Sequence, residues 1–440
     1  MTKLSTSPLK GMRDFYPADQ FVQDYIFQGM SETARRFGYE HYDGPLLEAT
    51  ELYAAKSGQE LVNEQTYTFV DRGERSLTMR PEMTPTLARM VAAKRNELAF
   101  PLRWYSIPNL FRYERPQRGR VREHWQLNVD IFGLDSLDAD VEIIEVAHSV
   151  MTNFGADPKR FEIHVNNRKL VNFFLYTSLS LSNEDGYKLS KLIDRRSKLP
   201  AETFESACRE ILGSRYSELL KFLEANSIED LHESLRNHEA ADDLAQVLKR
   251  LNNSGIQNAR FEPSLMRGFD YYTSTVFELF DTHPENRRAL FGGGRYDDLV
   301  GLFGVEKIAG VGFGMGDVTM RDFLETYDLM PAYKSSTDLF IGVLGDQAVE
   351  YALNLARFLR GQGVNTATDT TLRKAKAQMK AADRLSIPFA LFVGEQEVET
   401  QRFKVKVLTE HKEVELTRNE IAKFVLSSRT DHASGIKKQC

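Results

Sequence analysis

The pattern of apolar and polar residues predicts one prominent hairpin in the first third of the chain. Residues 104–113 and 123–132 are rich in aromatic and β-branched side chains, a composition typical of strands. Pro116 and Gly119 lie between the two runs and mark a loop. The segment is also strongly basic, since it contains Arg112, Arg115, Arg118, Arg120 and Arg122. We therefore expect two strands that carry a long cationic loop.

Periodicity elsewhere predicts a mixture of helices and strands. The expected elements, in chain order, are a helix over 20–37, an extended run over 39–45, a short hairpin over 67–80, a helix that starts near Pro85, a helix capped by Asp138 and ending near 151, and a strand over 161–165. Residues 168–253 have a helical pattern throughout. Alternation of strands and helices over 339–408 then predicts a compact α/β domain.

Composition and charge limit the class of protein. The 440 residues can hold two or three domains, and a net charge of −6 gives no global attraction to nucleic acid, so any RNA contact must use local basic patches. Cys208 and Cys440 are the only cysteines, and no metal-binding spacing occurs, so we expect neither a disulfide framework nor a metal held by the protein. No apolar run of 18 residues is present. We expect a cytoplasmic protein that does not enter the membrane.

Glycines are concentrated over 291–316. They occupy positions 292–294 and then alternate at 310, 312, 314 and 316 in a predicted strand, a spacing that fits neither a Rossmann nor a P-loop motif. Alternating glycines leave one face of a strand bare, which suits a flat ring or a small amino acid lying on the sheet. A tightly packed barrel corner is the alternative.

The central hairpin also carries the first candidate chemistry. Arg112 and Glu114 end its first strand, where a rigid element can aim a planar guanidinium at a phosphate. Gln126 and Asp130 lie four residues apart on the return strand and so share one face. A solvated basic hairpin with no ligand is the alternative.

This pattern resembles the second signature motif of class II aminoacyl-tRNA synthetases. The string FRYERPQRGRVREHWQ is similar to that of the histidyl-tRNA synthetase family, and RGFDYY over 267–272 resembles a histidine-specific signature of the same family. RPEMT over 80–84 resembles its amino-acid loop, although Glu82 or Thr84 could instead cap the following helix.

The resemblance implies roles for particular residues. It implies that Arg112 and Arg267 are catalytic at the α-phosphate. The implied histidine contacts are Glu82, Met83 (through its backbone), Thr84, Arg112, Gln126, Asp130, Arg267, Tyr271 and Tyr272. The implied ATP contacts are Arg112, Glu114 and Arg120, and the candidate tRNA contacts are Arg118, Arg373, Lys374 and Lys380. The last three belong to a basic helix expected over 372–385, for which a solvated helix face is the alternative.

The resemblance also implies the fold, substrates and partners. The fold would be α+β: an antiparallel sheet flanked by helices in a catalytic domain over 1–330, with a helical insertion at about 170–253. A linker over 331–337, an α/β anticodon-binding domain over 338–428 and a polar tail over 429–440 would follow. The implied substrates are ATP with Mg²⁺, L-histidine and tRNA(His). The implied assembly is a homodimer, because residues 20–45 resemble the first class II motif, which builds the dimer interface in that family.

Two positions depart from the family pattern. Thr319 stands where the third class II motif usually has an arginine, and Arg321 follows two positions later. Asp130 stands where we expect a glutamate. Two rivals therefore stay open: a histidine-sensing subunit of the ATP phosphoribosyltransferase type, and an RNA-binding protein that has lost catalysis.

Overall fold

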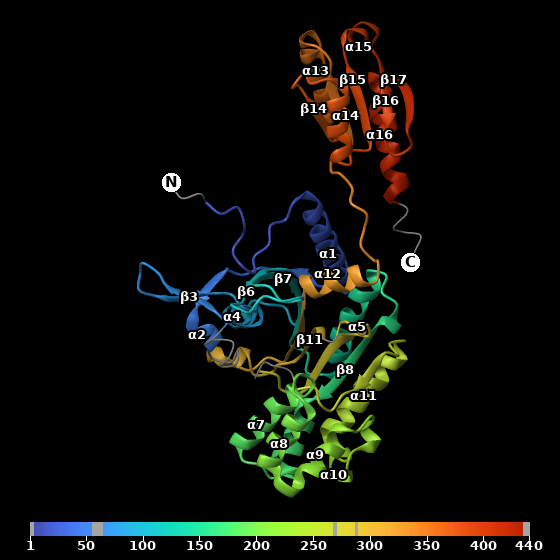
Figure 1. The fold of residues 1–440 in the computed structure, drawn as a ribbon. Helices are drawn as coiled ribbons and strands as arrows, with labels where there is room; N and C mark the ends of the chain where they lie inside the picture. The colour runs from blue at the N-terminus through green and yellow to red at the C-terminus, as the bar shows by residue number, and fades with distance from the viewer. Residues whose placement is uncertain (1–3, 55–64, 267–270, 287–288, 434–440) are drawn as a thin grey trace. The chain divides into compact units, whose positions relative to one another are not determined.

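The chain forms two compact units, Met1–Met330 and Pro331–Cys440. The computed structural model describes residues 4–54, 65–266, 271–286 and 289–433 (Figure 1). Within these ranges, no helix combines the length and the apolar character that crossing a membrane requires.

A mixed sheet organises the N-terminal unit. In the described part of the chain its strands follow the order β1 (Glu40–His41), β5 (Leu102–Ser106), β7 (Glu123–Phe132), β12 (Gly310–Gly316), β11 (Ala289–Arg295), β10 (Thr275–Asp281), β8 (Phe161–Asn167) and β9 (Ala259–Phe261), and β6 (Asn109–Phe111) also pairs with β7. The pairs are antiparallel except at the two edges, where β1 joins β5 and β9 joins β8 in parallel. The predicted α+β fold is confirmed, with a parallel pair added at each edge.

The central hairpin has the predicted return strand but a divided first strand. The division falls at Pro108, which has no N–H to donate to the ladder. The register continues across it, because Ser106 lies opposite Asn128 and Asn109 lies opposite Trp125. Both halves of the first strand therefore keep the same faces.

Helices α1 (Pro17–Arg36), α5 (Leu137–Asn153) and α12 (Asp317–Thr326) lie on one face of this sheet (Figure 1). Leu127, Val129 and Ile131 of β7 are fully buried in the main core with residues of these helices. Residues at even positions of β7 must then project from the other face, because side chains alternate along a strand. That face is partly covered by α4 (Thr84–Lys94), whose Leu87 and Val91 belong to a smaller core.

One predicted helix start is wrong in detail. α5 begins at Leu137 with Ser136 at the N-cap, so Asp138 lies inside the first turn. Its carboxylate pairs with Arg250 of α11 (Glu239–Asn253) instead of capping the helix.

The remaining elements of this unit are a small sheet and a group of helices. The predicted short hairpin is confirmed as β3 (Tyr67–Val70) and β4 (Ser76–Met79), to which β2 (Leu47–Ala49) is added, followed by α2 (Thr50–Ala54). The helical segment, green in Figure 1, contains α6 (Arg168–Asn172), α7 (Asn183–Asp194), α8 (Ala201–Leu212), α9 (Tyr216–Leu223), α10 (Glu233–Arg236) and α11 (Glu239–Asn253).

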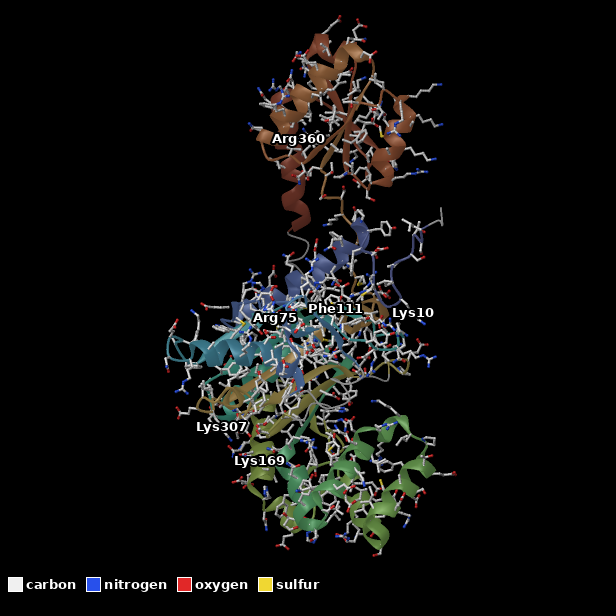
Figure 2. All side chains as sticks on the ribbon, turned by 90° about the vertical axis from the view of Figure 1, so that its left-hand side faces the viewer. Lys10, Arg75, Phe111, Lys169, Lys307 and Arg360 are labelled. Carbon is white, nitrogen blue, oxygen red and sulfur yellow. The ribbon has the colours of Figure 1, made fainter. Side chains whose placement is uncertain are left out.

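The C-terminal unit has its own sheet and core. Its strand order is β14 (Thr366–Asp369), β13 (Leu339–Val343), β15 (Phe389–Val393), β16 (Arg402–Val407) and β17 (Lys412–Thr417), and its helices are α13 (Val349–Gly361), α14 (Ala375–Arg384), α15 (Glu395–Thr400) and α16 (Arg418–Ala433). Arg360, labelled in Figure 2, ties α13 to β14 by donating from Nε and Nη2 to the Thr366 carbonyl at 3.1 and 2.8 Å. α16 continues to Ala433, past position 429 where the polar tail is expected to begin.

Candidate active site

Polar side chains gather on the even face of β7. Gln126, Asn128 and Asp130 are successive residues of that face, opposite Gly316, Gly314 and Gly312 of β12. The amide of Gln126 donates to Asn128 Oδ1 at 2.7 Å, and the amide of Asn128 donates to the Gln126 carbonyl at 3.0 Å. The predicted pairing of Gln126 and Asp130 on one face is confirmed, and Asn128 joins them as a residue that the sequence reasoning missed.

The glycines of β12 lie beneath these side chains. A Cβ atom at Gly312 would overlap Asp130 Oδ1, and one at Gly314 would overlap the Gln126 amide. The prediction that this stripe leaves bare sheet for a ligand is therefore wrong at these positions. The missing Cβ atoms make room for the protein's own polar side chains.

Asp130, like Asn128, is buried, with 2% of its surface exposed. The Tyr296 hydroxyl donates to its Oδ1. Its Oδ2 is buried and has no hydrogen-bond partner in the part of the chain that the structure describes. Burial raises the pKa of the Asp130 carboxyl to about 7, and the bond from Tyr296 acts in the opposite direction. The site thus contains a buried carboxylate whose pKa is raised by its burial.

Three tyrosine rings cover this acceptor. Ring centroids of Tyr271 and Tyr272 are 4.9 Å apart, and they lie 5.8 and 6.5 Å from the ring of Tyr296. The Tyr271 hydroxyl donates to Glu82 Oε2 at 3.1 Å, and the Thr84 side chain also bonds to Tyr271. Two segments nearly 190 residues apart in sequence, both predicted to hold histidine, are therefore in contact.

The loop before α4 does not use its polar side chains as helix caps. α4 begins at Thr84, and Met83 at the N-cap makes no side-chain cap bond. Met83 is fully buried and Glu82 is 2% exposed. The alternative of a capping role for Glu82 is thus not supported, since its carboxylate faces Tyr271 in the interior.

Arg112 is brought to the same loop. It follows the buried Phe111, labelled in Figure 2, and its Nε donates to the Pro81 carbonyl at 2.8 Å. His124, which the sequence reasoning missed although it continues the even series of β7, lies beside it. Burial, together with the guanidiniums of Arg112 and Arg13, lowers the pKa of His124 to about 3, so this ring is neutral at physiological pH.

The basic loop holds its arginines at the surface. Arg120 pairs with Glu114 at 3.0 Å, so the structure brings together two of the predicted ATP contacts. Arg118 is 60% exposed and lies 4.0 Å from Asp322 of α12.

Three further positions from the sequence analysis are Arg267, Thr319 and Arg321. Arg267 lies outside the described residues. Thr319 Oγ1 donates to the Leu290 carbonyl at 2.7 Å. Arg321 is held by Asp19 of α1 at 3.3 Å and by Glu325 of its own helix at 2.9 Å, so it is engaged in ion pairs on α12.

The basic segment of the C-terminal unit differs from the prediction. α14 starts at Ala375 with Lys374 at its N-cap, so Arg373 precedes the helix. Arg373 pairs with Asp369 at 2.6 Å, whereas Lys374 and Lys380 are exposed. Among the residues that the structure describes, no group of three His, Cys, Asp or Glu side chains is arranged to hold a metal ion.

Comparison with protein families gives two matches. The family model described as histidyl-tRNA synthetase matches residues 11–317. The model described as anticodon binding domain matches residues 338–428.

Individual relatives agree with these matches. A histidine–tRNA ligase of Leptospira biflexa is 41% identical over 410 residues, covering 92% of this chain and 93% of the relative. A histidine–tRNA ligase of Thermoplasma volcanium is 34% identical over 426 residues, covering 96% and 98%. Among solved structures, the apo histidyl-tRNA synthetase of S. aureus covers 97% of this chain and all of its own, with a TM-score of 0.72 and 27% identity. That of Nostoc sp. PCC 7120, at 22% identity and a TM-score of 0.81 over 97% and 100% of the two chains, shares the fold. The chain therefore belongs to the histidyl-tRNA synthetase family.

Proposed function

We propose that this protein is a histidine–tRNA ligase. It activates L-histidine with ATP to give histidyl-adenylate and pyrophosphate, and then transfers the histidyl group to the 3′ end of tRNA(His). The observation that carries the proposal is the buried carboxylate of Asp130. Its Oδ2 lacks a partner among the described residues, and its donor Tyr296 packs against Tyr271, which donates to Glu82. The carboxylates of Glu82 and Asp130 together suit an amino acid that has a cationic group at one end and a ring with an N–H at the other.

Histidine recognition follows from the chemistry of these groups. Glu82 supplies a negative charge for the α-ammonium group, with Thr84 and the backbone near Met83 completing that end. Asp130 accepts the imidazole N–H, and Gln126, Tyr271 and Tyr272 line the pocket. An apolar amino acid of similar size would leave the Asp130 acceptor unpaired, which costs on the order of 1 to 3 kcal/mol.

Activation is an in-line displacement. An oxygen of the histidine carboxylate forms a bond to the α-phosphorus of ATP, and the bond to the bridging oxygen breaks, with the electron pair leaving on pyrophosphate. Arg112, oriented by its bond to the Pro81 carbonyl, and Arg267 stabilise the charge that develops on the phosphoryl oxygens. Glu114 and Arg120 contact ATP, which arrives with Mg²⁺ shared among its phosphates.

Transfer uses the second substrate as the nucleophile. A terminal ribose hydroxyl of the tRNA attacks the carbonyl carbon of the adenylate, and AMP leaves. Arg118 on the basic loop, with Lys374 and Lys380 in the C-terminal unit, contacts tRNA phosphates. Arg373 contributes less to tRNA binding, because its guanidinium is already paired with the carboxylate of Asp369. We place this reaction in the cytoplasm. We also propose that the protein is a homodimer, because residues 20–45 resemble the first class II motif.

Histidine-dependent exchange of labelled pyrophosphate into ATP tests the proposal. We expect exchange with L-histidine and none with leucine or phenylalanine. Binding of histidine without exchange would favour the histidine-sensing rival. A structure named as an ATP phosphoribosyltransferase regulatory subunit/histidyl-tRNA synthetase, from Bacillus halodurans, has the same fold at a TM-score of 0.73 and 21% identity. Because that structure covers 89% of this chain, its match extends beyond the N-terminal unit, and the exchange assay is what separates the two readings.

A further inference from the structure

The polar surroundings of Asp130 extend beyond the residues assigned above. Tyr42 and Ser106 are both buried, with 9% and 0% of their surfaces exposed, and neither side-chain hydroxyl has a hydrogen-bond partner among the described residues. Ser106 and Trp104 on β5 lie opposite Asn128 and Asp130, on the same face of the sheet. A buried polar group without a partner costs about 1 to 3 kcal/mol. The grouping of hydroxyls around an unpartnered carboxylate oxygen therefore points to a polar ligand at this place.

Tyr296 determines which carboxylate oxygen is left for that ligand. It is 2% exposed, and its backbone N–H donates to the Gly310 carbonyl at 2.7 Å. Its ring packs edge-on against Phe132 at 5.9 Å and against Tyr271 at 5.8 Å. These contacts fix the hydroxyl that donates to Asp130 Oδ1.

We propose that Tyr296 is a positioning residue for histidine recognition, which holds Asp130 with Oδ2 directed to the imidazole N–H and preserves its negative charge. This inference rests on the proposed function. In a neutral imidazole one ring nitrogen donates and the other accepts, so an ionised acceptor in a fixed orientation selects it.

The charge argument follows from the neighbours of Asp130. Burial raises its pKa to about 7, and the bond from Tyr296 is the one influence found that lowers it within the described residues. Among the described residues, the other titratable groups around it are the phenols of Tyr42, Tyr271 and Tyr272 and, more remotely, Tyr39. Near Tyr42 lie also Asp43 and Arg80. Removal of the Tyr296 hydroxyl should therefore raise the pKa of Asp130 further.

Tyr296→Phe tests the proposal, with Tyr39→Phe as a matched control. Tyr39 is also buried and donates to a carboxylate, Glu142, at 3.0 Å, but that carboxylate is held by Arg103 as well. For Tyr296→Phe we expect the KM for histidine to rise and the KM for ATP to stay unchanged. In pyrophosphate exchange, the apparent pKa of kcat/KM for histidine should rise by about one unit, which corresponds to a loss of about fivefold at pH 7 and near-equality at pH 9. Tyr39→Phe should leave the profile unchanged.

Two further variants separate positioning from folding. Replacing Tyr296 with 3-fluorotyrosine keeps the ring and strengthens the donor, so the apparent pKa should fall below that of the wild type. In an Asp130→Asn background, Tyr296→Phe should produce no shift. If the wild type exchanges with histidine and both Tyr296 variants keep its pH profile, the inference is overturned and the proposed function stands. If the wild type shows no histidine-dependent exchange, the proposed function fails and this inference fails with it.

Discussion

Replacement of Gly312 by alanine should damage the site through packing alone. A Cβ atom there would overlap Asp130 Oδ1, and it would lie 2.6 Å from the Val129 carbonyl oxygen and 2.8 Å from the Tyr296 hydroxyl. The Val129 oxygen belongs to the backbone of a central strand and cannot turn aside. Forced overpacking of this kind costs about 1 to 3 kcal/mol in the free energy of unfolding. Displacement of the Asp130 carboxylate should also raise the KM for histidine.

Gly316→Ala is the matched control for stability. It lies on the same face of β12, its φ is −74°, and the nearest atom to an added Cβ would be Thr319 Oγ1 at an ordinary 3.7 Å. Because Gly316 is the N-cap of α12, where alanine is less favoured than glycine, we expect the control to lose no more than about 1 kcal/mol.

Urea denaturation followed by tryptophan fluorescence measures the difference. The chain has two tryptophans, Trp104 on β5 and Trp125 on β7, so the signal reports on the sheet that contains Gly312. Equal stability of Gly312→Ala and the wild type would refute the packing argument. So would a larger loss for Gly316→Ala than for Gly312→Ala.

Three further predictions concern the core, the chemistry and the RNA surface. Asp140→Ala should reduce the free energy of unfolding by about 1.5 to 3 kcal/mol in the same urea experiment, because it removes the buried carboxylate that accepts from Nε and Nη2 of Arg295, while Asp297 still pairs with Nη1; a loss below about 1 kcal/mol would contradict this. Arg112→Lys should lower kcat for pyrophosphate exchange by about 100-fold, since an ammonium group cannot form the planar fork, and near-normal kcat would remove Arg112 from the catalytic residues. Lys374→Ala with Lys380→Ala should weaken tRNA binding and reduce its salt dependence without changing exchange, and an unchanged salt dependence would exclude this surface.

Local sequence predicts much of the fold because the decisive signals are short-range. β7 has the predicted bounds, and the period of two along a strand is enough to place Gln126 and Asp130 on one face. Pro108 divides the first strand of the hairpin for an equally local reason, the absence of an N–H, and this could have been read from the sequence. The family strings likewise predict that residues 80–84, 112 and 271–272 serve one substrate.

The sequence by itself therefore determined the return strand of the central hairpin, its faces and the family, whereas the tertiary structure decided the edge strands and what each face contacts. Nothing near Tyr296 in sequence identifies Asp130 as its partner, 166 residues away. The same holds for the low pKa of His124, which depends on burial and on two distant guanidiniums. It also holds for the ion pairs of Arg321, which involve another helix. Strand order and helix packing bring these groups together, and the electrostatics of a buried group depend on all of its neighbours in space.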